Sequence, residues 1–111
     1  MKDLEVGLEE ARRLVGAGSR VYVFISNLGE LELVGEVLGA KDRTYGMDIG
    51  IAREIIFNQD IKAIRKVGEQ FRDAVIVCPH GNTSLRFAEA LSKLGVQSYS
   101  LNGGIEKLRG R

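Results

Sequence analysis

Two short apolar runs constrain the fold of this chain more than any other feature. Val21-Tyr22-Val23-Phe24-Ile25 and Ala74-Val75-Ile76-Val77 are hydrophobic at successive positions, so both of their alternating faces are apolar. Strands of this kind are buried on two sides, which is typical of a parallel sheet. An amphipathic helical pattern precedes each run, and another follows the second run. We therefore predict an α/β domain with a mostly parallel central sheet and helices on both faces.

The spacing of apolar residues predicts three helices and one further strand. The first helix, over residues 4–15, ends at Gly16 and Gly18, and the second, over residues 61–71, is capped by Asn58 or Asp60. The third covers residues 85–94 and is closed by Gly95, before a last strand over residues 99–101. Two segments are ambiguous. We expect a short strand near residues 32–34 and a glycine-rich loop over residues 47–51.

Composition and charge limit the classes of function. The 111 residues predict a single domain, 1–111, because no linker, repeat or low-complexity tract divides them. Sixteen basic and fifteen acidic residues give a net charge of +1, which predicts no nucleic-acid partner and no anionic membrane. The absence of a long apolar span or an apolar leader favours a cytoplasmic protein. One cysteine and one histidine are too few for a structural metal site.

The single cysteine is the candidate nucleophile. Cys78 follows the second apolar run and precedes Pro79-His80-Gly81-Asn82-Thr83-Ser84, which leads into a helix. Ligands of parallel sheets bind beyond the carboxyl ends of the strands, and the positive end of a helix stabilises a thiolate. A free cysteine is also often a small buried hydrophobe. Pro79 and Gly81 favour the first interpretation, because they suit a loop whose N–H groups cradle an anion.

The same residues resemble a known family. The loop C-x-x-G-x-T-S, formed by Cys78, Gly81, Thr83 and Ser84, and the segment Leu101-Asn102-Gly103-Gly104-Ile105 resemble the C-terminal half of a rhodanese domain. Upstream, Val21–Ile25 is similar to the first core strand of that family, and Gly35–Ala40 is similar to its G-H-I-P-G-A segment. The chain differs where the family commonly has an acidic residue and an arginine after the first strand, because Ser26 and Asn27 stand there.

The resemblance implies a sulfurtransferase. The Cys78 thiolate would take sulfane sulfur from a small donor such as thiosulfate or a persulfide, hold it as a persulfide and pass it to a thiophilic acceptor, which could be a protein. The residues implied to contact the substrate are those of the loop: Pro79, His80, Gly81, Asn82, Thr83 and Ser84. No cofactor is implied. Lys41, Arg43 and Arg53 are candidates for approaching an anionic donor from the upstream half.

Two other functions compete with this interpretation. A cysteine phosphatase or arsenate reductase needs an arginine six positions after the cysteine, where this chain has Ser84, and Arg86 lies two residues further on. A non-catalytic rhodanese-like module would carry sulfur or bind a partner without turnover.

Structural roles compete at single residues as well. His80 would be a solvated bystander, Thr83 or Ser84 a helix cap, and Asn102-Gly103-Gly104 a tight turn that needs positive φ.

Overall fold

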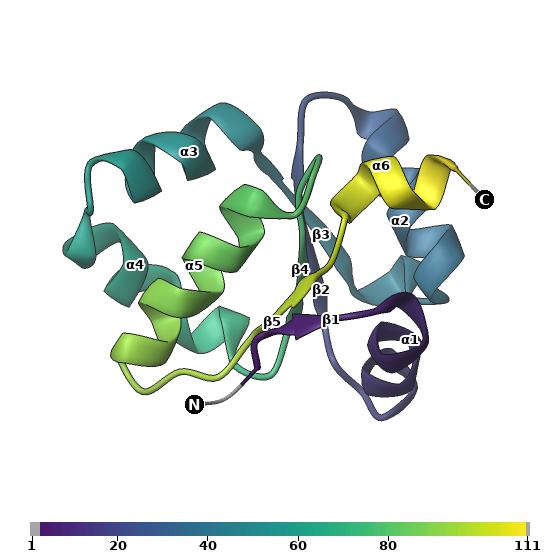
Figure 1. The fold of residues 1–111 in the computed structure, drawn as a ribbon, viewed down its shortest axis with the longest axis horizontal. Helices are drawn as coiled ribbons and strands as arrows, with labels where there is room; N and C mark the ends of the chain where they lie inside the picture. Colours follow the sequence, from purple (N-terminus) through teal and green to yellow (C-terminus); the bar gives the residue numbers. More distant parts are fainter. Residues whose placement is uncertain (1–2, 111) are drawn as a thin grey trace.

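Five parallel strands form one sheet at the centre of the protein. The structure is a computed structural model that describes residues 3–110. The sheet order is β1-β5-β4-β2-β3, and every neighbouring pair is parallel (Figure 1). The strands are β1 (Glu5–Val6), β2 (Val21–Ile25), β3 (Thr44–Asp48), β4 (Val75–Val77) and β5 (Tyr99–Leu101). The prediction of an α/β fold with a parallel sheet is confirmed.

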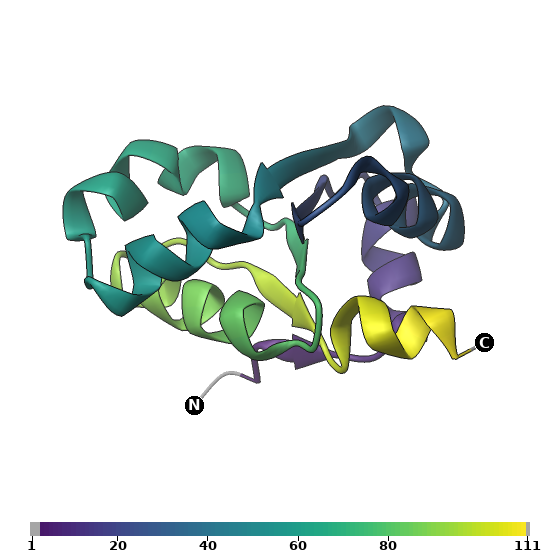
Figure 2. The ribbon, with the colours of Figure 1, turned by 90° about the horizontal axis from the view of Figure 1, so that it is seen from above.

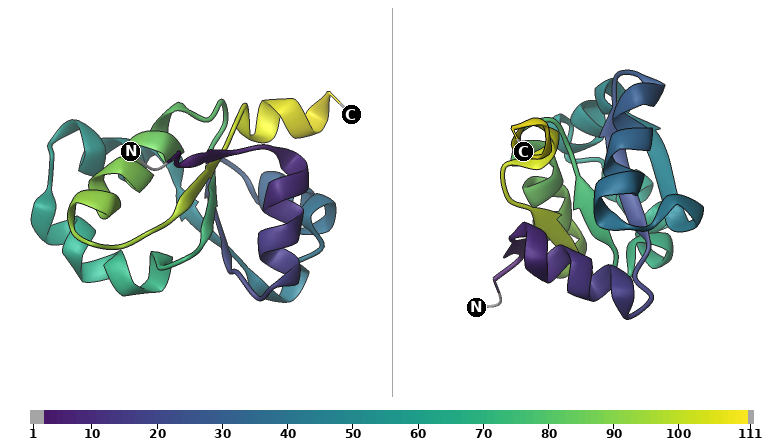
Figure 3. Two further views of the ribbon diagram at one scale, coloured as in Figure 1. Left: turned by 60° about the horizontal axis from the view of Figure 1, so that its bottom comes forward. Right: turned by 90° about the vertical axis from the view of Figure 1, so that its right-hand side faces the viewer.

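Helices cover both faces of this sheet, as the apolar runs predict. One face packs against α1 (Leu8–Gly16), α2 (Leu28–Leu38) and α6 (Gly104–Arg109). The other packs against α3 (Ile49–Phe57), α4 (Ile61–Val67) and α5 (Asn82–Lys93). Figures 2 and 3 show these two groups on opposite sides of the strands. The short 3₁₀ helices η1 (Lys41–Arg43) and η2 (Gly68–Phe71) precede β3 and β4.

The core consists of two hydrophobic clusters, one on each face. Val21 and Val23 of β2 pair with Val75 and Val77 of β4 and face the first helix group. Phe24 belongs to the second cluster with residues of the other helix group. Complete burial of such side chains contributes about 1.5–3 kcal/mol each, so the two central strands anchor the domain. The loops at their carboxyl ends therefore start from fixed positions.

Three predictions about the first half of the chain are wrong. Leu4 does not begin the first helix, because β1 (Glu5–Val6) precedes α1 and pairs with β5. Residues 32–34 are helical, since α2 runs from the Asn27 cap to Gly39, whose φ is +70°. Residues 47–51 do not form a loop. Gly46 and Met47 lie in β3, opposite Val23 and Phe24, and α3 begins at Ile49.

Predictions for the second half hold more closely. Asp60 is the cap of α4, since its side chain accepts a hydrogen bond from the Ala63 N–H, but the predicted helix over residues 61–71 becomes 3₁₀ from Gly68. The strand predicted from Ala74 begins one residue later, at Val75. Gly95 follows α5 with φ +83°, and β5 covers Tyr99–Leu101 as expected.

Candidate active site

Cys78 lies directly after β4, at the carboxyl edge of the sheet. It belongs to the hydrophobic cluster on the side of α5 and is 1% exposed. The loop that carries it joins β4 to α5 at the edge of the sheet where α6 also begins (Figure 1). The predicted position of the cysteine, between a buried strand and the start of a helix, is confirmed.

Three donors converge on the Cys78 sulfur. The backbone N–H groups of Gly81 and Ser84 donate to Sγ at 3.1 and 3.2 Å, and the Ser84 hydroxyl donates at 3.2 Å. Gly81 precedes α5 with φ +91° and ψ −2°, a conformation that glycine adopts at little cost and that turns its N–H toward the sulfur. Donors of this kind stabilise a thiolate more than a thiol. The cradle expected from the sequence therefore surrounds Sγ.

Ser84 connects the sulfur to a second buried hydroxyl. Its Oγ lies 2.7 Å from Oγ of Ser100 in β5, and both serines are 0% exposed. The capping role considered for Thr83 or Ser84 is wrong. Gly81 occupies the cap position of α5, with no side-chain cap hydrogen bond. The Ser84 hydroxyl instead faces Sγ. Nothing in the local sequence pointed to Ser100, which reaches the site only through the pairing of β5 with β4.

The start of α6 supports the loop from its other side. The Ile105 N–H donates to the Cys78 carbonyl oxygen at 2.9 Å, and the Glu106 N–H donates to that of Pro79 at 3.0 Å. A Cβ added at Gly104 would lie 2.0 Å from the Cys78 carbonyl oxygen, so only glycine fits there. Gly103 and Gly104 have φ of +80° and +60°, which confirms the expected positive-φ turn.

The remaining predicted site residues border the cradle. Pro79 and Thr83 are half-buried, whereas His80 and Asn82 are exposed. Of the upstream cations, Lys41 and Arg43 form η1, which precedes β3 and so lies at the amino edge of the sheet, away from Cys78. The Arg43 guanidinium donates to the Val15 carbonyl oxygen. The structure does not bring these two cations to the loop. Arg53 is exposed on α3, which begins at the carboxyl edge.

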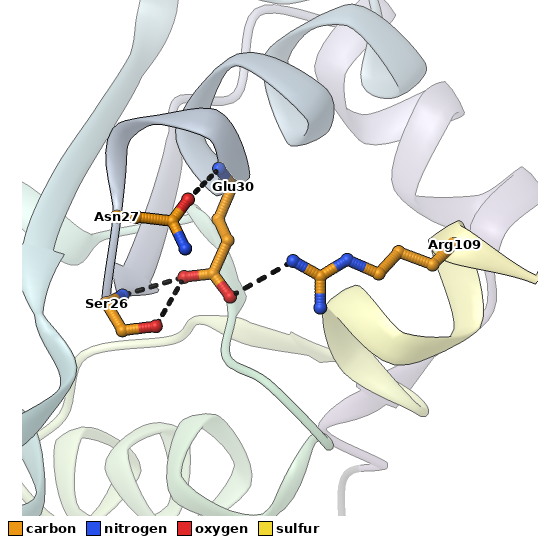
Figure 4. A network of polar contacts seen from close by, with 4 residues as sticks. All are labelled: Ser26, Asn27, Glu30 and Arg109. Atoms are coloured by element: carbon orange, nitrogen blue, oxygen red, sulfur yellow. Dashed lines mark hydrogen bonds and ion pairs between the residues drawn. The ribbon is translucent and has the colours of Figure 1, made fainter.

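A buried carboxylate lies at the same edge, after β2. Glu30, which is 5% exposed, accepts hydrogen bonds at Oε1 from the N–H and hydroxyl of Ser26, and Arg109 of α6 approaches Oε2 at 3.4 Å (Figure 4). The Asn27 side chain caps α2 through the Glu30 N–H. Although burial opposes ionisation, the hydrogen bonds from Ser26 and the Asn27 backbone and the charge of Arg109 hold the pKa of Glu30 below its ordinary value.

The sequence analysis missed this network, although a signal for it was present. Asn27 followed three residues later by Glu30 is close to a capping box, the pattern that marks a helix start. Arg109 could not have been assigned, because it lies 79 positions after Glu30.

Comparisons with known proteins found no matching family model, no matching curated protein and no matching solved structure. Within residues 3–110, no helix has the length and apolar character needed to cross a bilayer. The same residues contain no group of three or more histidine, cysteine, aspartate or glutamate side chains placed to bind a metal ion.

Proposed function

We propose that this protein is a rhodanese-type sulfurtransferase that carries sulfane sulfur as a Cys78 persulfide. The observation that carries the proposal is the convergence of the Gly81 N–H, the Ser84 N–H and the Ser84 hydroxyl on one sulfur atom at the start of α5. Donors that meet at a sulfur stabilise its anionic form, which is the nucleophilic form. A cysteine with only a packing role needs no such partners.

The proposed reaction has two balanced steps. First, the Cys78 thiolate attacks the outer sulfur of thiosulfate, a new S–S bond forms, and sulfite leaves with the electron pair of the broken bond. Second, an acceptor such as cyanide attacks the terminal sulfur, and the Cys78 thiolate is restored as the leaving group. No oxidant or reductant is consumed. The N–H groups of Gly81 and Ser84 serve both steps, because each begins or ends with negative charge on sulfur.

Burial of Cys78 places a condition on the first step. Because Cys78 is only 1% exposed, a sulfur donor can reach Sγ only when the loop opens. The exposed side chains on this side of Cys78 are those of His80 and Asn82. The N–H groups of Ile105 and Glu106 in α6 hold the Cys78 and Pro79 carbonyl groups at the start of the loop. Small reagents should therefore reach Cys78 faster than bulky ones.

The test is the intact mass of the protein after thiosulfate and then after cyanide. We expect the gain of one sulfur atom, its removal by cyanide, and neither change in Cys78→Ser. Ser98→Ala is the matched control, because Ser98 is equally buried and its hydroxyl has no partner. Sulfur uptake that persists in folded Cys78→Ser would contradict the proposal.

Burial also favours one alternative, a module that carries sulfur from protein persulfides without turning over small donors. In that case the protein would accept sulfur from a persulfidated partner but not from thiosulfate. The phosphatase alternative gains no support, because the donors to Sγ are backbone amides and a serine, whereas Arg86 is exposed on α5. An aryl phosphate should therefore not be hydrolysed.

A further inference from the structure

We propose that Ser100 is a positioning residue for the Cys78 thiolate, acting through the Ser84 hydroxyl. The inference rests on the proposed function, since it concerns the state of the sulfur that this function uses. The contacts form a chain of three side chains: Ser100 of β5, Ser84 of α5 and Cys78 in the loop between β4 and α5. Oγ of Ser100 lies 2.7 Å from Oγ of Ser84, which in turn lies 3.2 Å from Sγ.

Strand pairing brings Ser100 to this position. In the parallel register of β4 and β5, Ser100 lies opposite Ile76, two residues before Cys78. Because side chains two apart share a face of a strand, Ser100 is on the same side of the sheet as Ile76 and Cys78, under α5. Ser100 is 0% exposed, and a hydroxyl buried this fully is unfavourable unless it is hydrogen-bonded. Its partner is Ser84.

Hydrogen counting sets the direction of the chain. Each serine hydroxyl has a single hydrogen, so when Ser84 donates to Sγ, Ser100 must be the donor to Ser84. This is the arrangement that a thiolate requires, since a thiolate only accepts. When Cys78 is a thiol, its S–H can donate to Ser84, and Ser84 can then donate to Ser100. Both hydroxyls therefore reverse the direction of their hydrogen bonds when Cys78 loses its proton to solvent. By donating to the Ser84 oxygen, Ser100 leaves the Ser84 hydrogen directed at Sγ.

All the hydrogen-bond donors to this sulfur are neutral groups. The charged side chains on the surrounding elements are Arg86, Glu89 and Lys93 on α5 and Glu106, Lys107 and Arg109 on α6, and like His80 in the loop they are all exposed. The other titratable side chain there is Tyr99 of β5, which is half-buried. Glu30, beyond the end of β2, is paired with Arg109. None of these groups is among the hydrogen-bond partners of Sγ, which are Gly81 and Ser84. Loss of one link in the hydroxyl chain should therefore be measurable.

The experiment compares four variants by two readouts that need no sulfur donor. Thiolate absorbance in the ultraviolet, followed across pH, gives the midpoint of Cys78 ionisation, and iodoacetamide gives the rate of alkylation at neutral pH. We expect Ser100→Ala to raise the midpoint and slow alkylation roughly two- to fivefold, and Ser84→Ala to slow it about tenfold. Ser98→Ala, an equally buried serine whose hydroxyl has no partner, should match the parent.

The double variant Ser84→Ala/Ser100→Ala should behave as Ser84→Ala does, because Ser100 has no route to the sulfur once Ser84 is removed. The proposal is overturned if Ser100→Ala titrates as the parent does, or if its effect persists in the Ser84→Ala background. Should Ser84→Ala fail to fold, as judged by circular dichroism, the comparison of Ser100→Ala with Ser98→Ala still decides. A shifted midpoint in a protein that takes up no sulfur would refute the proposed function and leave this inference intact.

Discussion

Two loops at the carboxyl edge of the sheet each hold an acceptor side chain at the start of a helix, and they hold it with different partners. After β2, the Glu30 carboxylate is bound by Ser26 and faces the Arg109 guanidinium. After β4, the Cys78 sulfur is bound by two backbone amides and the Ser84 hydroxyl. Both acceptors are almost fully buried, and α6 contacts both loops, through Arg109 in one case and Ile105 in the other.

The contrast separates a carboxylate that stabilises the structure from a sulfur that, under the proposed function, is used for chemistry. The Glu30 carboxylate accepts two hydrogen bonds from Ser26 and faces a solvent-screened guanidinium, so its charge is satisfied within the fold. Neutral donors would stabilise a thiolate at this sulfur without cancelling its charge, on which its nucleophilicity depends. The four changes below alter one loop or the other, in order of decreasing expected effect.

Gly104→Ala should have the largest effect, because it removes the support that α6 gives to the cysteine loop. The new Cβ would lie 2.0 Å from the Cys78 carbonyl oxygen and 2.8 Å from the Gly81 nitrogen, both of them backbone atoms that cannot easily move. We expect a loss of about 3 kcal/mol or more in the free energy of unfolding, measured with urea.

The control is Gly95→Ala, at φ +83° with no atom within 4 Å of the added Cβ, which should cost only about 1 kcal/mol. Equal losses in the two variants would show that the close approach of Gly104 to the loop has no energetic weight.

Glu30→Gln should reduce stability by about 2 kcal/mol at neutral pH, because the Ser26 donors then face a neutral amide oxygen in place of a buried carboxylate. Since the pKa of Glu30 is lowered in the folded state from the ordinary 4.5, its contribution is complete above that value and disappears as the pH falls through the lowered folded pKa. The difference between parent and variant should therefore shrink in acid.

Urea unfolding at several pH values measures this difference. Glu69→Gln is the control, because Glu69 pairs with Arg72 at the surface and its loss should change stability little. A parent-to-variant difference that stays constant into acid would rule out the charge of Glu30 as its source.

Pro79→Arg gives the cysteine loop the kind of counter-ion that Glu30 already has. Without a fixed charge in the loop, thiosulfate should bind weakly and saturate poorly. The added guanidinium should lower the KM for thiosulfate about threefold to tenfold, and the KM of the variant should rise more steeply with ionic strength. Pro79→Gln controls for loss of the proline ring. Tight saturation by the parent would mean that charge outside the loop already binds the donor.

Arg109→Ala should have the smallest effect. Its guanidinium is 3.4 Å from Glu30 and the side chain is 51% exposed, so solvent screens the pair and the loss should be about 0.5 kcal/mol. Urea unfolding at low and high salt should show the difference only at low salt. A loss as large as that of Glu30→Gln would instead make Arg109, not Ser26, the main partner of the carboxylate.

Local sequence patterns predicted the helices and strands whose own residues are strongly apolar. They failed for segments whose structure depends on pairing or packing with another part of the chain. β2 has the predicted bounds, since Val21–Ile25 is hydrophobic throughout. β3 was missed because Thr44–Asp48 contains Gly46 and has mostly exposed side chains, and it is a strand because it pairs with β2. In α2, Leu31 and Leu33 alternate with Glu30 and Glu32 as in a strand, but the Asn27 cap and packing of Val34 favour a helix.

The candidate site divides in the same way. Cys78, Gly81 and Ser84 are close in sequence, so a strand, a glycine and a helix start sufficed to predict their association. Ser100 and Gly104 come from the following strand and helix, and their contacts depend on the register of β5 and the start of α6. Such contacts depend on how the strands and helices are arranged in the fold, so local residue spacing cannot predict them.

The two amides that donate to the cysteine sulfur allow the chemical state of this atom to be followed by NMR without an activity assay. Gly81 and Ser84 donate their N–H groups to Sγ at about hydrogen-bonding distance, 3.1 and 3.2 Å. Their proton and nitrogen resonances in a nitrogen-15-labelled sample therefore depend on what the sulfur carries. A proton, an alkyl group and a second sulfur atom would each give a different pair of peak positions, while amides at the amino edge of the sheet stay unchanged. The protein thus has a built-in indicator of its own chemical state.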